Sequence, residues 1–190
     1  MNDSEELWDK RYSDNPVLNP PSEFLEEFEQ YLPNQGTCVD IAGGNGRNAL
    51  WFAKKGYTTS VIDISSVALN QAAKSAQSQE VELECIYWDI EKNLLPPERT
   101  WDIALLTLFL NRGVLQTTNE YLNPQGILLF AQPTKKNLER HQHPSKRFLL
   151  DPSEIFEISE NLTGMEILHV DEGWRTSERH EAWLACKKVT

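Results

Sequence analysis

Three acidic residues stand at or near the ends of short apolar runs in the first half of this 190-residue chain. Asp40 lies near the end of the first run, Asp63 follows the second and Asp89 follows the third. A carboxylate at such a place can attract an ammonium group or accept hydrogen bonds from hydroxyl and amino groups. Asp40 could attract an ammonium group, Asp63 could accept from both hydroxyls of a ribose and Asp89 could accept from an adenine amino group. We therefore expect a ligand that contains an adenosine.

A glycine-rich segment follows Asp40 and consists of Ala42, Gly43, Gly44, Asn45 and Gly46. Small residues let backbone N–H groups approach a ligand closely, and the start of the next helix favours negative charge. Two cofactors suit this geometry: S-adenosylmethionine, and a dinucleotide, since Gly44, Gly46 and Ala49 match G-x-G-x-x-G/A. Because a carboxylate at Asp40 repels a pyrophosphate and attracts an ammonium group, S-adenosylmethionine is favoured.

Strand and helix signals alternate along the chain and predict how these residues are positioned. Strands are expected at residues 37–41, 57–62, 82–87, 101–107, 126–131, 165–170 and 181–187. Helices are expected at 48–55, from 65 or 66 to 78, at 115–122 and from 151 onward. This alternation predicts a parallel sheet that binds its ligand at the carboxyl ends of the strands. The last two runs are too close for a crossover helix, so an antiparallel final pair is expected.

The composition narrows the class of partner. With 29 acidic and 18 basic residues the chain has a net charge of −11, which opposes binding to nucleic acid or to an anionic membrane, so neither is expected as a partner. No apolar run reaches the roughly 18 residues of a membrane span. The first residues lack the basic start and apolar stretch of a signal peptide, so a cytoplasmic location is predicted.

Cysteines and histidines show no spacing typical of metal ligands. Cys38, Cys85 and Cys186 lie in separate apolar runs and are expected to be buried thiols. His141 and His143 form an i, i+2 pair without a cysteine or acidic partner at ligand spacing. We therefore predict no metal.

The acidic residue and glycine segment resemble the first motif of class I S-adenosylmethionine-dependent methyltransferases, with Ala42 in place of the first glycine. Within that superfamily the chain is most similar to the small tellurite-resistance-type methyltransferases. The segments that carry this likeness are residues 8–12 (Trp-Asp-Lys-Arg-Tyr), 106–112, 147–150 (Arg-Phe-Leu-Leu) and 179–182 (Arg-His-Glu-Ala). The resemblance covers nearly the whole chain. It implies an α/β fold with a Rossmann-like, seven-stranded, mostly parallel sheet, helices on both faces and an antiparallel last strand.

The resemblance also implies how the chain is divided. Residues 1–190 would form a single methyltransferase domain, in which N-terminal helices within 1–34 cover the cofactor site of a core formed by 35–190. Arg11 and Tyr12 would then lie over the cofactor, and Arg11 would bind its carboxylate, as an arginine fork does well. An exposed N-terminal helix is the alternative interpretation.

The cofactor site implied by these motifs extends beyond the glycine segment. Leu106 and Thr107 would line the methyl-donor pocket, and Trp88 would stack near the adenine, although ordinary core positions would carry the same residues. The whole predicted cofactor set is Arg11, Tyr12, Asp40, Ala42, Gly43, Gly44, Gly46, Asp63, Ile64, Trp88, Asp89, Ile90, Leu106 and Thr107.

His180 and Arg179 are the candidate catalytic residues. Methyl transfer from a sulfonium requires a positioned nucleophile, and it requires a base only if the acceptor must lose a proton. His180 suits that role because the ordinary pKa of histidine is about 6.5, and Arg179 would hold an anionic acceptor. A structural hydrogen bond at a strand start is the alternative role for His180. Arg112 and Arg147 are expected at the same mouth as substrate-binding residues.

These residues predict an S-adenosylmethionine-dependent methyltransferase that releases S-adenosylhomocysteine and acts on an unidentified, small-molecule acceptor. A monomer or a homodimer is expected. Two alternatives remain open: an NAD-dependent oxidoreductase, although no Tyr-x-x-x-Lys pair occurs in the chain, and a protein that binds S-adenosylmethionine without turnover.

Overall fold

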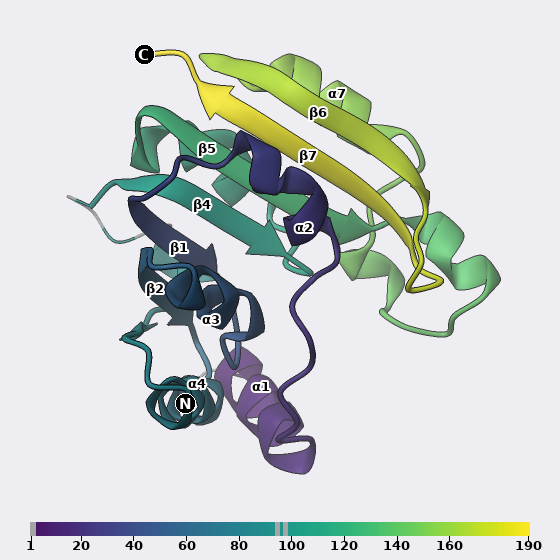
Figure 1. Cartoon of the computed structure of the whole chain (residues 1–190). Coiled ribbons are helices and arrows are strands. Elements are labelled where there is room, and N and C mark those ends of the chain that lie inside the picture. Colours follow the sequence, from purple (N-terminus) through teal and green to yellow (C-terminus); the bar gives the residue numbers. More distant parts are fainter. Residues whose placement is uncertain (1–2, 94–95, 97–98) are drawn as a thin grey trace.

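One sheet organises the computed structural model, which describes residues 3–93, 96 and 99–190 (Figure 1). In the described part of the chain seven strands pair in the order β3-β2-β1-β4-β5-β7-β6. The strands are β1 Thr37–Ile41, β2 Thr58–Asp63, β3 Glu84–Tyr87, β4 Trp101–Thr107, β5 Leu122–Pro133, β6 Met165–Trp174 and β7 His180–Lys188. The chain reverses strand order after β3 and returns beside β1, which leaves a crevice at the carboxyl ends where such sheets bind ligands.

The direction of the strands follows from the length of their connections. The strands from β1 to β5 are parallel, and each crossover between them carries helix or helical turns. Strand β7 pairs antiparallel with both β5 and β6, and only residues 175–179 join β6 to β7. A turn of this length closes a hairpin but cannot carry a crossover helix. The predicted antiparallel final pair and the mostly parallel, Rossmann-like sheet are confirmed.

Helices cover both faces of the sheet (Figure 1). The α-helices are α1 Asp3–Asp14, α2 Phe24–Phe28, α3 Arg47–Lys54, α4 Ser66–Ser78, α5 Ile90–Asn93, α6 Arg112–Thr117 and α7 Glu154–Asn161. The 3₁₀ turns are η1 Glu29–Tyr31, η2 Thr118–Tyr121, η3 Lys135–Glu139 and η4 Lys146–Phe148. Because side chains alternate along β4, Ile103 and Leu105 pack in the core shared with α2, whereas Ala104 and Leu106 pack in the core shared with α6 and α7.

Helices α6 and α7 differ from the sequence prediction in their bounds. The helix expected at 115–122 begins at Arg112, because the Asn111 side chain accepts a hydrogen bond from the Val114 N–H at 3.1 Å and caps it there. It ends early, since η2 follows it and Leu122 already belongs to β5. The last helix begins at Glu154, so the expected start at 151 lies in the turn before it.

Helix α2, within the N-terminal segment, packs on the sheet. Its apolar residues Phe24, Leu25 and Phe28 are fully buried, and their cluster includes Trp183 of β7. Burying three large apolar side chains against the sheet is worth several kcal/mol, which fixes α2 on the sheet.

No helix in the described part of the chain is both long and apolar enough to span a membrane.

Candidate active site

The glycine segment forms the turn between β1 and α3, and its backbone explains its composition. Gly44 and Gly46 have φ angles of 58° and 78°, in the left-handed region that glycine adopts without strain. Ala42 has a φ of 53°, so the alanine that replaces the first glycine of the motif occupies a conformation costing a non-glycine residue about 1–2 kcal/mol. A Cβ atom at Gly43 would lie 2.5 Å from the Asp40 carboxyl carbon, so glycine is required there.

Asp40 is a buried carboxylate, and one of its two oxygens has no hydrogen-bond partner among the described residues. Its Oδ2 accepts a hydrogen bond from the Ala49 N–H at 3.2 Å, while Oδ1 is buried without a hydrogen-bond partner among the described residues. Burial raises the pKa of Asp40 to about 7, although the nearby Arg47 guanidinium and the Ala49 N–H act in the opposite direction. An unpartnered carboxylate oxygen at a strand end suits a ligand that brings a cation or a donor.

Asp63 closes β2 beside Asp40 and is also buried. Its Oδ2 accepts a hydrogen bond from the Gly44 N–H at 2.8 Å, and its Oδ1 accepts one from the Ser65 N–H at 2.8 Å. Burial raises its pKa, because the desolvation of the carboxylate outweighs these backbone donors. The carboxylate is therefore fixed between the glycine segment and the start of α4.

The residues after β3 are joined to Asp63 by a backbone hydrogen bond. The Trp88 N–H donates to the Asp63 carbonyl oxygen at 3.0 Å, and Trp88 packs at the edge of the core. Asp89 is at the start of α5, where its Oδ2 lies 3.1 Å from the Lys92 ammonium. Ile90 is buried and Ile64 is half-buried. The structure thus brings all four predicted residues to the same sheet edge as Asp63.

Helix α1 places Tyr12 directly over the glycine segment. A Cβ atom at Gly44 would lie 1.9 Å from the Tyr12 hydroxyl oxygen, so the two residues are in close contact. Burial raises the pKa of Tyr12 above its ordinary value, and the carboxylates of Asp63 and Asp40 raise it further. The Arg11 guanidinium stacks on the Trp8 ring at 4.8 Å and is exposed. The predicted position of Tyr12 at this site is therefore observed.

The end of β4 presents one core residue and one polar residue. Leu106 is fully buried in the apolar core on the α6 and α7 face. Thr107 faces the other side, where its Oγ1 accepts a hydrogen bond from the Asn48 side chain at 2.9 Å. Thr107 and Leu106 are both buried, on opposite faces of the sheet.

His180 begins β7 at the same edge of the sheet. Its Nδ1 lies 2.8 Å from Thr134 Oγ1, its backbone N–H donates to the Asn137 side chain, and its ring meets Trp174 edge to face. Burial lowers the pKa of His180, although Glu172 acts in the opposite direction. Its neighbour Arg179 is exposed. The ring is thus held rigidly near the carboxyl ends of β5.

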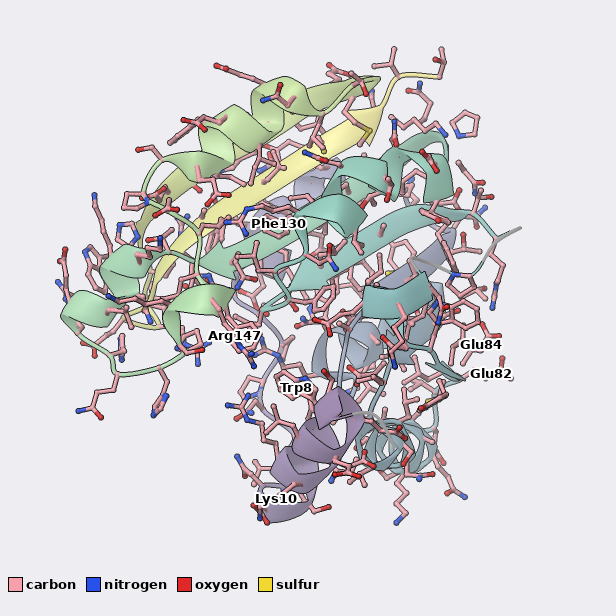
Figure 2. The ribbon with its side chains drawn as sticks, turned by 180° about the vertical axis from the view of Figure 1, so that it is seen from behind. Trp8, Lys10, Glu82, Glu84, Phe130 and Arg147 are labelled. Carbon is pink, nitrogen blue, oxygen red and sulfur yellow. The ribbon has the colours of Figure 1, made fainter. Side chains whose placement is uncertain are left out.

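The two predicted substrate arginines lie in different surroundings. Arg112 pairs with Glu154 through two nitrogens at 2.5 and 2.8 Å, so that carboxylate occupies its guanidinium. Arg147 stacks over Phe148 at 4.4 Å and lines a pocket of about 230 Å³ together with Trp8 of α1 (Figure 2). The other residues that line this pocket are Ser4, Leu7, Glu91, Leu110 and Phe148. The pocket therefore lies between α1, α5 and the segment that follows β5.

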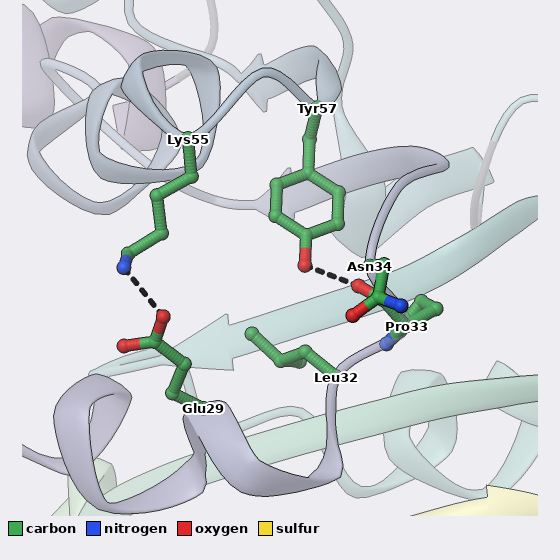
Figure 3. Close-up of a pocket in the computed structure, with 6 residues that line it drawn as sticks. All are labelled: Glu29, Leu32, Pro33, Asn34, Lys55 and Tyr57. Carbon is green, nitrogen blue, oxygen red and sulfur yellow. Dashed lines mark hydrogen bonds and ion pairs between the residues drawn. The ribbon is translucent and has the colours of Figure 1, made fainter.

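A further pocket of about 300 Å³ lies elsewhere (Figure 3). It is lined by the Glu29–Lys55 ion pair, at 2.6 Å, and by Tyr57, whose hydroxyl donates to the Pro33 carbonyl oxygen. These residues precede β1 and β2, so the pocket is at the amino ends of the strands, away from Asp40.

Sequence reasoning missed the polar residues that hold the N-terminal segment in place. The Asn45 side chain donates to the Val17 carbonyl oxygen at 3.2 Å, and Arg47 donates to Ser22 Oγ at 2.9 Å. Asn48 accepts from the Ser22 N–H at 2.8 Å. All three follow glycines in the motif, but the contacts span more than 20 residues in sequence and carry no local signal.

The matches to known proteins agree with this geometry. Residues 17–161 match the family model described as a methyltransferase domain. The chain belongs to this methyltransferase-domain family. The match runs from the N-terminal segment through β1 to α7 and so includes both aspartates and the glycine segment. The family resemblance inferred from the sequence is confirmed.

Individual relatives are distant. The tRNA 5-carboxymethoxyuridine methyltransferase of Escherichia coli K12 is 27% identical over 106 residues, which cover 50% of this chain and 40% of that protein. The structure of TehB from Haemophilus influenzae has a TM-score of 0.69 at 16% identity, covering 97% of this chain and 66% of that one. An S-adenosylmethionine-dependent methyltransferase from Clostridium acetobutylicum has a TM-score of 0.67 at 13% identity, covering 96% of both chains. These two structures share the fold.

Proposed function

We propose that this methyltransferase-family protein binds S-adenosylmethionine at the carboxyl ends of β1 and β2 and transfers its methyl group to a small acceptor. The observation that carries this proposal is the buried Asp40 oxygen without a partner, beside Asp63 and the glycine segment. An ammonium group would satisfy that oxygen, whereas a pyrophosphate would be repelled by it. The NAD-dependent alternative is therefore disfavoured.

The residues present fit each part of this cofactor. Asp40 would hold the ammonium group, Asp63 the ribose hydroxyls and Asp89 the adenine amino group. Arg11, which lies over the Trp8 ring, would bind the carboxylate. The cofactor supplies an activated methyl group on a sulfonium, whose leaving group is neutral when it departs. The protein then has to hold the acceptor in line with the methyl group and exclude water, and Tyr12 over Gly44 contributes to that exclusion.

The acceptor enters, in this proposal, through the pocket between Trp8 and Arg147 (Figure 2). Four of its seven lining residues are leucine or aromatic, whereas Ser4 and Glu91 are polar, and the Arg147 guanidinium lies at its side. A small polar acceptor with one anionic group that pairs with Arg147 suits it. Arg179 is exposed and can bind an anionic group of the same acceptor. Arg112 contributes only if the acceptor competes with Glu154.

His180 serves as the base if the acceptor must lose a proton. In this role the His180 Nδ1–H would donate to Thr134 Oγ1, 2.8 Å away, and Nε2 would accept the proton. The lowered pKa keeps the imidazole neutral at pH 7, as a base requires. The enzyme is further proposed to be cytoplasmic, metal-independent, and a monomer or homodimer.

The direct test measures ligand binding and then turnover. S-adenosylhomocysteine should bind at micromolar affinity or better, and NAD should not compete with it. Binding of NAD without binding of S-adenosylhomocysteine would overturn the proposal. A labelled methyl donor incubated with a library of small anionic acceptors should yield labelled product, whereas binding without any turnover would favour the non-catalytic alternative.

An RNA acceptor is the competing outcome, because the E. coli relative is named for methylation of a tRNA base. The basic residues between Lys135 and Arg147 would contact phosphates in that case, although Lys135 already pairs with Asp151. The net charge of −11 opposes such binding. Transfer of label to bulk tRNA, and to no small acceptor, would overturn the small-acceptor proposal.

A further inference from the structure

Asp9 joins helix α1 to the start of helix α4. Its Oδ1 accepts hydrogen bonds from the Ser65 hydroxyl at 2.6 Å and from the Val67 N–H at 3.1 Å, and its Oδ2 lies 3.4 Å from the Ser66 hydroxyl. The N–H groups in the first turn of a helix have no partner within that helix, and a carboxylate there is favoured. The Ser65 hydroxyl already caps the Ala68 N–H of α4, so Asp9 adds a partner for the Val67 N–H and holds the Ser65 hydroxyl in place.

A second contact fixes the same two helices near the end of α1. The Gln71 side chain of α4 donates to the Tyr12 carbonyl oxygen at 2.8 Å. Figure 1 shows α1 lying beside α4 at the edge of the sheet. Two contacts, one near the start of α4 and one further along it, determine both the position and the direction of α1.

Hydrogen bonds continue from Asp9 into the candidate cofactor site. Ser65, which donates its hydroxyl to Asp9, also donates its N–H to the Asp63 carboxylate, and Asp63 accepts from the Gly44 N–H. Gly44 is in turn covered by Tyr12, which follows Asp9 on α1. Helix α1 is thus connected to Gly44 in two ways: by hydrogen bonds from Asp9 through Ser65 and Asp63, and by direct contact with Tyr12.

We propose that Asp9 is a positioning residue that latches α1 over the cofactor site, so that Arg11 and Tyr12 face a bound cofactor. This inference rests on the proposed function, because it assigns the latch to that same site. Asp9 itself touches no reacting atom. Without its carboxylate, α1 spends part of the time undocked. The undocked protein still binds the cofactor through Asp40 and Asp63 but without Arg11, so the apparent affinity falls toward that weaker value as the docked fraction decreases.

The chain offers a matched control on the same helix. Asp14 is an exposed carboxylate that pairs with Lys10 at 2.8 Å on the surface. Surface pairs of this kind contribute little. Asp14→Ala therefore removes a carboxylate from α1 without touching α4. Asp9→Asn is the conservative variant, because its amide oxygen can still accept from Ser65 and Val67.

The first measurement needs no ligand. Amide hydrogen exchange across residues 3–14 should be about tenfold faster in Asp9→Ala than in the wild type, nearly unchanged in Asp14→Ala, and largely restored in Asp9→Asn. Exchange in the strands should stay the same, which shows that the core remains folded. Equal exchange in Asp9→Ala and Asp14→Ala would overturn the latch.

The second measurement links the latch to the site. Asp9→Ala should weaken the binding of S-adenosylhomocysteine about tenfold, or 1.4 kcal/mol, and Asp14→Ala should weaken it less than twofold. Arg11→Ala should reduce the affinity for S-adenosylhomocysteine by a smaller factor in the Asp9→Ala background than in the wild type, since Arg11 acts only when α1 is docked. Unchanged affinity in Asp9→Ala, or full additivity with Arg11→Ala, would overturn the coupling. If the wild type binds no S-adenosylhomocysteine, the proposed function is wrong. The hydrogen-exchange comparison still tests whether Asp9 holds α1 against α4.

Discussion

Asp40 should make cofactor binding depend on pH in a defined direction. Burial raises its pKa from 3.8 to about 7, which corresponds to about 4 kcal/mol of free energy against the ionised carboxylate in the unliganded protein. Because the pKa is higher in the folded than in the unfolded state, this carboxyl stabilises the unliganded fold most below pH 4, and that contribution is lost as the pH rises to about 7. An ammonium group at the unpartnered Oδ1 would reverse the preference and favour ionisation.

The expected magnitude follows from the ionised fraction. With a pKa of about 7, roughly a tenth of the Asp40 carboxyls are ionised at pH 6 and nine tenths at pH 8. The affinity for S-adenosylhomocysteine should therefore rise about tenfold between these pH values. 5′-Methylthioadenosine has no ammonium group, so its affinity should lack this rise. The ratio of the two affinities also cancels any titration of Asp63, which faces the ribose of both ligands.

Isothermal titration calorimetry at pH 6, 7 and 8 in buffers of different ionisation enthalpy measures both affinity and proton release. The wild type should release close to one proton on binding S-adenosylhomocysteine at pH 6 and almost none at pH 8. Asp40→Asn should remove this release and weaken S-adenosylhomocysteine at pH 8 by about 1.5–3 kcal/mol. A ratio of affinities that stays constant from pH 6 to 8, or an Asp40→Asn variant that keeps the pH dependence, would refute the assignment of Asp40 to the ammonium group.

Three further variants test neighbouring residues. Asp63→Ala should weaken S-adenosylhomocysteine and 5′-methylthioadenosine alike, by roughly 1–3 kcal/mol in a binding titration, through loss of charged hydrogen bonds; a loss confined to one ligand would contradict its ribose role. Arg11→Ala should weaken S-adenosylhomocysteine more than 5′-methylthioadenosine, because only the former has a carboxylate, and equal losses would exclude that contact. His180→Ala should lower kcat about 10²- to 10⁴-fold with little change in cofactor affinity and remove the acid limb of the rate profile. A lower Tm with near-normal kcat would instead assign His180 to anchoring β7 through Thr134.

Residues close together in sequence determined much of this site. The run from Asp40 to Gly46 predicts a strand, a tight turn and a helix, because small residues and positive φ angles are properties of a short segment. Strand ends are likewise local, so Asp63 and Asp89 could be placed at the carboxyl edge from their spacing alone. The same local reasoning predicted the antiparallel end of the sheet, since five residues between β6 and β7 leave no room for a crossover helix.

Only the tertiary structure decided which distant residues meet. Asp9 contacts the start of a helix that begins 57 residues later, Arg112 pairs with Glu154 across 42 residues, and α2 packs in the same core cluster as Trp183 of β7. Such contacts depend on how the elements pack, and a lone aspartate or arginine looks the same in sequence whether it faces solvent, a helix start or another charge. Burial likewise sets the raised pKa of Asp40, because desolvation comes from the packed protein around the carboxyl and from no property of its neighbours in sequence.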